Sequence, residues 1–550
     1  MDLPYKKDTK REKMSKLTKL IKSPKRFFQD AWRKKFESQN KKPLPSKLNK
    51  LDKNIFMQIV NFASSYPTSS MKVDEEYIWP YLRSHLWINI NYLSIGNTRY
   101  KTINPYGIQL GYRNNLPFFK REELSIKYNI KEIAEIPHSI NKLDFLFITS
   151  LNAAEHVFLD NGKIYNRISS PLSEVANTIG SIERLEMVKV NTPSLKKVKD
   201  YDSVPTFVFA PNLQKSGYFE KLNLHRFFYR LFKLKVPSQV LNESVMHNLV
   251  DWELHTRDYY LDLLTRMNPK VILLNGYHYY APLLSAADAL GIVTVDIQHG
   301  LQVGWNPLYN NWDEMPQEGY QALPDYFAVW GEKEYDNIQK VFEGKKHQPI
   351  ILGNLWFEKQ KSEVKDMSLT FKGTIKDYRI KVLLVMQNQT EVPLFFKEII
   401  DNAPNDIAWI IRHHPKGTKF KSKDFSKINK TNIFLSKEID DASWSQLFQY
   451  IDVSISEGSA VALEADGFGV YNIIVSEEGK DNYQKEINEE KFFYAENYET
   501  FFDILNSLDL TDKNPKVNAF EKVDVLSVLN VFLSKYEEKQ QKIMKEIHAK

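Results

Sequence analysis

The sequence predicts an α/β protein with two doubly wound domains, each a parallel sheet between helices. Short apolar runs of strand length alternate with helical stretches from residue 270 to residue 475, which is typical of parallel sheets. The runs at 270–276 and 293–297 flank an Ala- and Leu-rich helix at 280–290, a strand–helix–strand unit with a right-handed crossover. A chain of 550 residues also exceeds what one hydrophobic core supports, so several domains are expected.

The first domain is expected to span residues 51–330. Asp160-Asn161-Gly162-Lys163 contains Asn-Gly, a dipeptide typical of a tight hairpin turn. The region before residue 268 is expected to be mostly helical apart from its strands. A helix is expected at 79–87, and strands at 144–149, 187–190, 206–210, 270–276 and 293–297.

The second domain is expected to span residues 331–518, with a C-terminal helix at 519–550. The connection 301–324 is rich in Trp, Asn, Pro and Gly and is too long for an ordinary turn, so we expect a functional loop there. A second series of strands is expected at 325–330, 349–352, 381–386, 407–411, 432–435, 453–455 and 471–475.

The composition excludes several classes of protein. The chain has no cysteine, which rules out disulfides, thiolate metal sites and a cysteine nucleophile and fits a reducing compartment. No apolar run approaches the roughly 20 residues that span a bilayer, and the N-terminus lacks the apolar core of a signal peptide. We therefore expect a cytoplasmic protein.

The basic charge is concentrated at the N-terminus. Residues 1–50 carry 17 Lys and Arg against 5 Asp and Glu, or +12, whereas the whole chain carries +6, so residues 51–550 carry −6. An acidic body argues against a nucleic-acid partner. Within residues 1–50, aromatic side chains stand among cations at near-helical spacing, which predicts an amphipathic segment on an anionic membrane surface followed by a linker. A solvated basic tail is the alternative. The aromatic residues are Phe27, Phe28, Trp32 and Phe36.

Polar residues follow several of the expected strands. Ligands of open parallel sheets bind beyond the carboxyl ends of the strands. The run at 293–297 ends in Gln298-His299-Gly300, the run at 270–274 ends in Asn275-Gly276, and Gln387 follows the run at 381–386. We expect these residues to line a cleft between the domains. A histidine that only caps its own loop is the structural alternative for His299.

Two strand ends of the second domain predict a phosphate pocket. The run at 407–411 leads into Arg412-His413-His414-Pro415-Lys416, where cationic donors can form charge-assisted hydrogen bonds. The run at 453–455 leads into Ser456-Glu457-Gly458-Ser459 before a helix, which supplies hydroxyls and backbone N–H groups. Glu464 in that helix is expected to accept from ribose hydroxyls. A structural histidine and a simple helix N-cap are the alternatives for His414 and Ser459.

Two common nucleotide fingerprints are missing. No Gly-x-Gly-x-x-Gly follows a strand, and there is no Gly-x-x-x-x-Gly-Lys-Ser/Thr phosphate loop. Nucleotide-sugar chemistry is then the prominent class for a protein with two such domains.

These residues together carry a family resemblance. Gln298-His299-Gly300, Pro324-Asp325-Tyr326-Phe327, Gly353-Asn354, Arg412-x-His414-Pro415 and Ser456-Glu457-Gly458-Ser459 resemble bacterial surface-polysaccharide glycosyltransferases of the GT-B fold. The similarity is to capsule enzymes that handle Kdo, sialic acid or related nonulosonic acids. The second-domain motifs also resemble CDP-glycerol glycerophosphotransferases, and residues 19–30 resemble the basic aromatic anchor of capsule enzymes.

The resemblance implies roles for individual residues. It implies that His414, Ser456 and Ser459 hold the phosphate of a CMP or CDP donor and that His299 is the base. The sequence departs from the family in having one serine where two adjacent serines are usual. Sialyltransferases of this fold use an acidic residue before a glycine as the base, and here Asp160 comes nearest, although its tripeptide is more typical of a hairpin turn.

We therefore expect a glycosyltransferase that moves a nonulosonic acid from a CMP donor to a hydroxyl of a capsule or other surface glycan. We expect neither metal nor cofactor, because no Asp-x-Asp pair stands in a metal-binding context. The expected partners are the nucleotide-sugar donor, a lipid-linked acceptor, the inner face of the cytoplasmic membrane and other capsule assembly proteins. The alternatives are a polyol-phosphate or neutral-sugar transferase with a CDP or UDP donor, and a non-catalytic scaffold of a capsule assembly complex.

Overall fold

In the computed structural model, residues 51–550 contain two large parallel sheets, one of seven strands and one of six. The expected membrane residues Phe27, Phe28, Trp32 and Phe36, together with Asp160 and Lys416, lie outside the described residues. None of the helices in the described part of the chain is long and apolar enough to cross a membrane. The structure describes residues 53–94, 129–139, 141–150, 155–159, 162–188, 205–209, 243–312, 314–363, 365–387, 389, 391–415, 417–428, 430–517 and 519–548.

The first sheet has seven strands in the order β11-β10-β9-β8-β3-β6-β7, and all neighbouring pairs are parallel. Its centre, β8 and β9, is an almost continuous apolar run, as expected of a parallel strand covered on both faces. The strands are β3 (Leu143–Ser150), β6 (Ile182–Val188), β7 (Thr206–Phe209), β8 (Pro269–Leu274), β9 (Val293–Ile297), β10 (Tyr326–Val329) and β11 (Gln348–Ile351).

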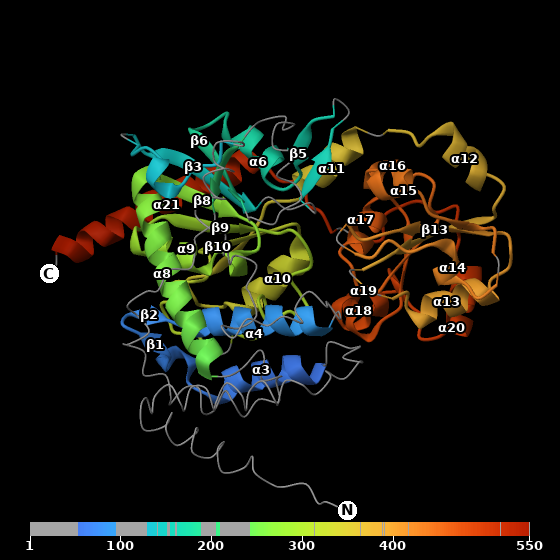
Figure 1. Cartoon of the computed structure of the whole chain (residues 1–550), viewed down its shortest axis with the longest axis horizontal. Coiled ribbons are helices and arrows are strands. Elements are labelled where there is room, and N and C mark those ends of the chain that lie inside the picture. The colour runs from blue at the N-terminus through green and yellow to red at the C-terminus, as the bar shows by residue number, and fades with distance from the viewer. Residues whose placement is uncertain are drawn as a thin grey trace, which may run out of the picture. The chain divides into compact units, whose positions relative to one another are not determined.

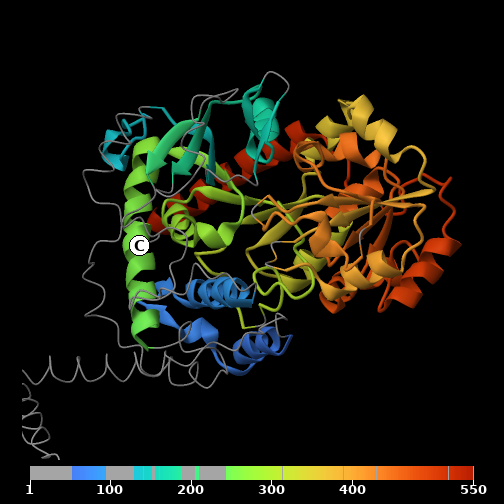
Figure 2. The same cartoon turned by 45° about the vertical axis from the view of Figure 1, so that its right-hand side comes forward.

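Helices cover both faces of this sheet (Figures 1 and 2). Because side chains alternate along a strand, Ile272 and Leu274 of β8 join the core under one set of helices, whereas Val271 and Leu273 join the core under the other. The first set is α4 (Trp79–Ser94), α8 (Glu243–Met267) and α9 (Ala281–Ala289), and the second is α6 (Ser169–Ala176) and α21 (Val525–His548). This part of the chain is therefore doubly wound, as predicted.

The second sheet has six parallel strands in the order β14-β13-β12-β15-β16-β17. Along β12, Val382 and Leu384 face the core that includes α13 and α20, and Leu383 and Val385 face the core that includes α12, α16 and α17. The strands are β12 (Ile380–Val385), β13 (Ile407–Arg412), β14 (Ile433–Phe434), β15 (Val453–Ser456), β16 (Tyr471–Ile474) and β17 (Phe493–Tyr494). The helices are α12 (Leu369–Ile375), α13 (Leu394–Asn402), α16 (Trp444–Phe448), α17 (Val461–Gly467) and α20 (Tyr498–Ser507).

The change from one sheet to the other comes later than expected. We placed the start of the second domain at residue 331, but β10 and β11 both belong to the first sheet, so the change follows residue 351. The reason is the strand pairing: β10 adds to β9 and β11 adds to β10, both in parallel, so the first sheet gains two strands after the connection 301–324. The connection itself packs into the core of the first domain. Arg83 of α4 donates to three of its carbonyls, and the Arg83 guanidinium lies 4.1 Å from the ring centroid of Trp312.

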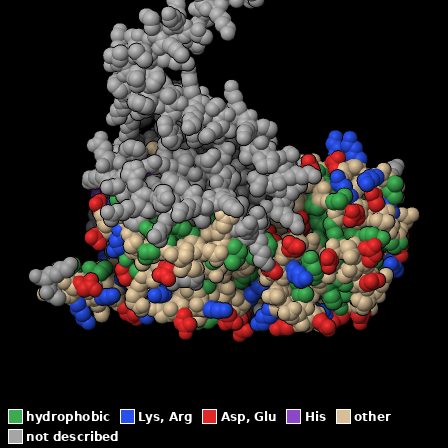
Figure 3. Space-filling model, turned by 90° about the horizontal axis from the view of Figure 1, so that it is seen from below, with side chains coloured by type: hydrophobic (Ala, Val, Ile, Leu, Met, Phe, Trp, Pro, Cys, Tyr) green, Lys and Arg blue, Asp and Glu red, His purple; other side chains and the backbone are tan. Residues whose placement is uncertain are grey.

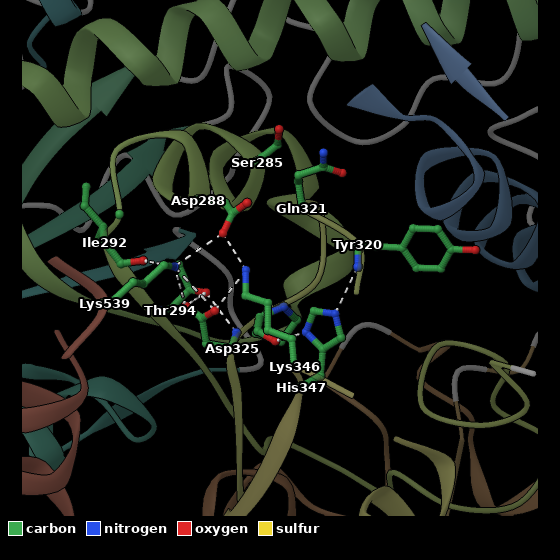
Figure 4. Close-up of polar contacts among 12 residues, drawn as sticks. Ser285, Asp288, Ile292, Thr294, Tyr320, Gln321, Asp325, Lys346, His347 and Lys539 are labelled. Atoms are coloured by element: carbon green, nitrogen blue, oxygen red, sulfur yellow. Dashed lines mark hydrogen bonds and ion pairs between the residues drawn. The ribbon is translucent and has the colours of Figure 1, made fainter. Parts of the chain in front are cut away.

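Helix α21 returns from the end of the second domain to lie beside β8 and β9 (Figure 1). Figure 4 shows how its Lys539 is held: the Lys539 ammonium lies 3.2 Å from a carboxylate oxygen of Asp325 and 3.3 Å from Asp288. The Lys346 ammonium also lies 3.1 Å from Asp325, and the backbone N–H of Thr294 donates a hydrogen bond to the Asp325 carboxylate. Burial alone would raise the pKa of Asp325, but the two lysines and the hydrogen bonds hold it well below its usual range. This network lies at the amino ends of β9 and β10.

Acidic and basic side chains are interspersed over the described part of the face seen in Figure 3. A mixed surface of this kind fits the slightly acidic balance of residues 51–550.

Candidate functional site

The loop after β9 is fixed by its first residue. Gln298 is 2% exposed, its side-chain oxygen accepts from the backbone N–H of Trp330 at 2.7 Å, and its amide donates to the carbonyl of Gly300 at 2.9 Å. The amide of Gln298 thus ties the ends of β9 and β10 together, and this accounts for its side chain without a ligand. His299 follows directly and is half-buried at the carboxyl end of the strand.

The end of β8 lies against His299, as the strand order predicts. Gly276 has φ +71°, and a Cβ placed on it would lie 3.4 Å from His299 Cε1. This left-handed backbone conformation favours glycine, and a Cβ would also lie only 3.0 Å from the ring of Tyr279. Asn275 is buried, and its Oδ1 has no hydrogen-bond partner among the described residues. Asn275, Gly276, Gln298, His299 and Gly300 therefore share one edge of the first sheet.

Asp296 holds the loop that follows β8 at this edge of the sheet, and it was not among the predicted site residues. Its side chain is completely buried and accepts from the backbone N–H of Tyr277 and from the Tyr309 hydroxyl, both at 3.1 Å. Burial raises its pKa to about 7, against the effect of these hydrogen bonds. A carboxylate inside the apolar run 293–297 was the signal, because buried acids in strands need a partner or a task.

Arg412 closes β13 in the second domain. Its guanidinium carbon lies 3.8 Å from the ring centroid of Trp444, and Trp444 in turn stacks on Phe448. Nη1 of Arg412 is buried and has no hydrogen-bond partner among the described residues. Burial lowers the pKa of Arg412 to about 10, which still leaves it cationic at neutral pH. A buried cationic N–H without an acceptor is costly, and an anion would relieve that cost.

Glu464 lies near this guanidinium. The side chain is 6% exposed, and burial raises its pKa. The charges of Arg167 and Arg412 oppose that rise, so both guanidinium groups lie near the Glu464 carboxylate. Arg167 belongs to the first domain, and nothing in its sequence context singled it out. The predicted contact of Glu464 with ribose stays a prediction.

The two histidines of the His-His-Pro triplet differ. Nε2 of His413 accepts from the backbone N–H of Phe420 at 3.0 Å, so Nδ1 carries the proton and donates to Asp440 at 3.1 Å. His413 is thus the structural histidine of the pair. His414 is half-buried, and a Cβ on Gly417 would lie 3.2 Å both from the Cβ of His414 and from the carbonyl oxygen of Gln387. His414 and Gln387 therefore lie side by side; Pro415 is exposed.

The serine loop leaves β15 two strands away from Arg412. The hydroxyl of Ser456 accepts from the N–H of Gly458 at 3.5 Å, and the hydroxyl of Ser459 accepts from the N–H of Val461 at 3.3 Å. Each hydroxyl keeps its own proton to donate to a ligand. Gly458 has φ +120°, and a Cβ there would lie 2.9 Å from the Cα of Gly479, so this close approach of two backbones needs glycine.

Glu457, inside the serine loop, is a second residue for which the sequence predicted no role. Its carboxylate accepts from the side-chain amide of Gln389, which follows β12. Burial raises its pKa to about 7, and this hydrogen bond opposes the rise. A carboxyl group that titrates near neutral pH at a strand end can act as a general acid or base.

The loops of the two domains share one hydrophobic cluster. Leu301, two residues after His299, and Ala460, next to Ser459, both pack against buried residues that include Trp330, Leu463 and Tyr483. Further contacts join the same elements. The Tyr483 hydroxyl donates to the carbonyl of Ser459 at 2.7 Å, the Trp305 indole donates to Asp481 at 2.8 Å, and the Lys333 ammonium lies 2.6 Å from Glu486. The His299 loop and the serine loop are thereby brought to the same region.

Asp160, the alternative to His299 as the base, lies outside the described residues. β4 (His156–Phe158) and β5 (Ile164–Asn166) pair in antiparallel fashion, which confirms the predicted hairpin. No group of three or more His, Asp or Glu side chains among the described residues is placed to hold a metal ion. The expectation of a metal-independent reaction stays a prediction.

No protein-family model matches the chain, and no curated protein matches it either. Several solved structures resemble it at low identity. One is a UDP-GlcNAc 2-epimerase from Neisseria meningitidis bound to UDP-GlcNAc, which is 11% identical over 72% of this chain and 100% of that chain, with a TM-score of 0.44.

Two others are similar to a comparable degree. The calicheamicin glycosyltransferase CalG4 is 10% identical over 74% of this chain and 98% of that chain, with a TM-score of 0.39. A Methanocaldococcus jannaschii UDP-GlcNAc 2-epimerase in complex with UDP-GlcNAc and UDP is 12% identical over 74% and 100%, with a TM-score of 0.39. Two doubly wound parallel sheets in one chain are the GT-B fold class expected from the sequence.

Proposed function

We propose that the chain is a glycosyltransferase that moves a sugar from a nucleotide donor to a hydroxyl group. The observation that carries the proposal is the buried, cationic Nη1 of Arg412 without a hydrogen-bond partner among the described residues, at the same carboxyl edge of the second sheet as the serine loop. Ligands of parallel sheets bind at that edge, and a phosphate group supplies the acceptor oxygens that this donor lacks.

The residues divide the reaction between the two domains. Arg412, His414 and the hydroxyls of Ser456 and Ser459 would hold the donor phosphate and offset the negative charge that grows on it as the sugar leaves. His299, on the first domain, would take the proton from the acceptor hydroxyl. Glu457 is a second candidate for acid–base work, because burial raises its pKa to about 7.

For the donor we propose a CMP-linked nonulosonic acid and for the acceptor a lipid-linked surface glycan. The basic, aromatic residues 1–50 would hold the enzyme at the inner face of the cytoplasmic membrane, where such acceptors are presented. A polyol phosphate or neutral sugar on CDP or UDP is the second candidate, and it uses the same phosphate contacts.

Calorimetric titration with CMP, CDP and UDP, followed by donor hydrolysis assays, tests the proposal. We expect one nucleotide to bind, and Arg412→Gln to weaken that binding by about tenfold to a hundredfold, because hydrogen bonds to charged groups contribute about 1.5 to 3 kcal/mol. Arg379→Gln is the matched control, since Arg379 pairs with Asp406 at the exposed start of β12. Equal binding by Arg412→Gln and the control would refute the phosphate site.

A further inference from the structure

Arg167 reaches the candidate site from the first domain. It follows β5, and its backbone N–H donates to the carbonyl of Glu155 at 2.9 Å. The neighbouring Asn166 is fully buried, and its side-chain oxygen accepts from the N–H groups of Ile168 and Ser169 at 3.0 and 3.1 Å. The turn that carries Arg167 is therefore held on both sides by backbone hydrogen bonds.

Helix α11 (Leu355–Ser362) connects this turn to the Arg412 platform. The ring of Tyr165, two residues before Arg167, lies 5.8 Å from the ring of Trp356 on α11. One turn further along α11, the side-chain oxygen of Gln360 accepts from the backbone N–H of Trp444 at 3.0 Å. Trp444 is the ring on which the guanidinium of Arg412 lies. A continuous set of contacts thus leads from the hairpin of the first domain to the cation of the second.

Charged side chains of both domains gather at this place. Arg167 and Arg412 both lie near the single buried carboxylate of Glu464. Asp440 and Asp441 are further carboxylates whose charges act on Arg412, and Asp440 is already bonded to His413 and Lys419. Two guanidinium groups near each other repel, and an anion bound between them would relieve that repulsion. Nη1 of Arg412 lacks an acceptor among the described residues, so it can donate to such an anion.

We infer that Arg167 and Arg412 form a single anion site around Glu464 and that this site, shared by the two domains, receives the phosphate group of the donor. The identity of the anion rests on the proposed function. Arginine suits this task because its planar fork donates two parallel hydrogen bonds to a phosphate.

Arg167 is a site residue on this account, and its effect is measurable without turnover. The affinity ratio of CMP to cytidine, or of UDP to uridine, isolates the contribution of the phosphate. We expect Arg167→Gln to reduce that ratio by about tenfold or more and leave nucleoside affinity unchanged, because it removes charge-assisted hydrogen bonds. Arg167→Lys keeps the charge but loses the fork, so we expect an intermediate reduction.

The matched control is Arg266→Gln, which removes another arginine of the first domain, one that pairs with Asp262 along α8. We expect its CMP-to-cytidine ratio to equal that of the wild type. Thermal melting shows that each variant is folded; if Arg167→Gln is not, the reduction in Arg167→Lys decides. An unchanged ratio in Arg167→Gln, or an equal loss for nucleoside and nucleotide, would overturn the inference. So would a loss seen only with donors whose sugar carries a carboxylate.

Binding of inorganic pyrophosphate tests the anion site independently of the proposed function. If the wild type binds no nucleotide, but pyrophosphate raises its melting temperature and does so less in Arg167→Gln, the anion site stands and the donor assignment falls. If nucleotides bind and Arg167→Gln binds them like the wild type, the donor site stands without Arg167. If neither nucleotide nor pyrophosphate binds, both are wrong.

Discussion

The two edges of the first sheet treat buried charge in opposite ways. At the amino edge, Asp325 meets Lys539, Lys346 and the N–H of Thr294, and these partners hold its pKa low. At the carboxyl edge, one strand away, Asp296 is buried with neutral donors only, and its pKa rises to about 7. This difference indicates that the charged groups of the amino edge stabilise the fold, whereas the carboxyl edge retains polar groups that a reaction can use.

Removing His299 is expected to give the largest effect at the carboxyl edge. We expect His299→Ala to lower the rate of sugar transfer by about 100-fold to 10,000-fold, the usual contribution of a general base, with donor affinity unchanged. His138→Ala, at an exposed position, is the control. Steady-state transfer assays and calorimetry on both variants decide the point, and transfer at the wild-type rate in His299→Ala would leave the base to Asp160 or Glu457.

Removing Asp325 is expected to give the largest loss of stability at the amino edge. Asp325→Asn removes a buried carboxylate from the half-buried ammonium groups of Lys539 and Lys346, which then share the Asp288 carboxylate, at a cost of about 3 to 5 kcal/mol in the free energy of unfolding. Its native pKa lies below its unfolded value, so the stabilisation is present above about pH 4 and is lost as the pH falls further. Urea unfolding at pH 7 measures the loss. The control is Asp262→Asn, which breaks an ion pair with Arg266 near the surface and should cost less than about 1 kcal/mol.

Asp296 is expected to give the opposite dependence on pH. Its native pKa of about 7 lies above the unfolded value, so the native state holds the proton more tightly and stability falls as the pH rises from about 4 to about 7. The total change is at most roughly 4 kcal/mol, and Asp296→Asn should remove it. Urea unfolding of the wild type and of Asp296→Asn at pH 5 and pH 8 checks the sign. A wild type that gains stability over this range would contradict the assignment.

The smallest expected effect comes from the hydroxyl of Thr294. It donates to Asp325 and accepts from the backbone N–H of the same residue, at 3.1 and 3.0 Å. Thr294→Val keeps the shape and removes both bonds, which we expect to cost about 1 to 3 kcal/mol of stability because one buried donor is left unpaired. Transfer activity should not change. A parallel loss of activity would show that the two edges are not independent.

Strands and their polar ends were predictable because both are local. The spacing of apolar residues, the composition of each apolar run and the residue after it predicted β8, β9, β12, β13 and β15 and the loops that follow them. The domain boundary was not predictable, because the runs that form β10 and β11 have the same local pattern as the strands of the second sheet, and only their pairing with β9 assigns them to the first sheet. Short β17 was missed for lack of any periodic signal.

The candidate site was predictable only in part, because local sequence indicates some of its residues and contacts between distant parts of the chain place the others. Arg412, His414 and the serine loop follow strands, so the rule about carboxyl ends finds them. Arg167 follows a two-stranded hairpin outside either sheet's core, and only α11 brings it to Arg412. Asp296 was visible as an acid in an apolar run, but its hydroxyl partner, Tyr309, comes from the long connection.

The return of α21 has a consequence for the order of events during synthesis. The second sheet and its helices are encoded by the continuous stretch from residue 369 to residue 507, whereas the first sheet lacks one of its covering helices until Lys539 has been made. On the ribosome, therefore, the domain encoded second has all of its own elements before the domain encoded first. Until α21 has been synthesised, the apolar face of β8 and β9 lacks Leu529, Phe532 and Tyr536, and a chain truncated before residue 525 would leave that face uncovered.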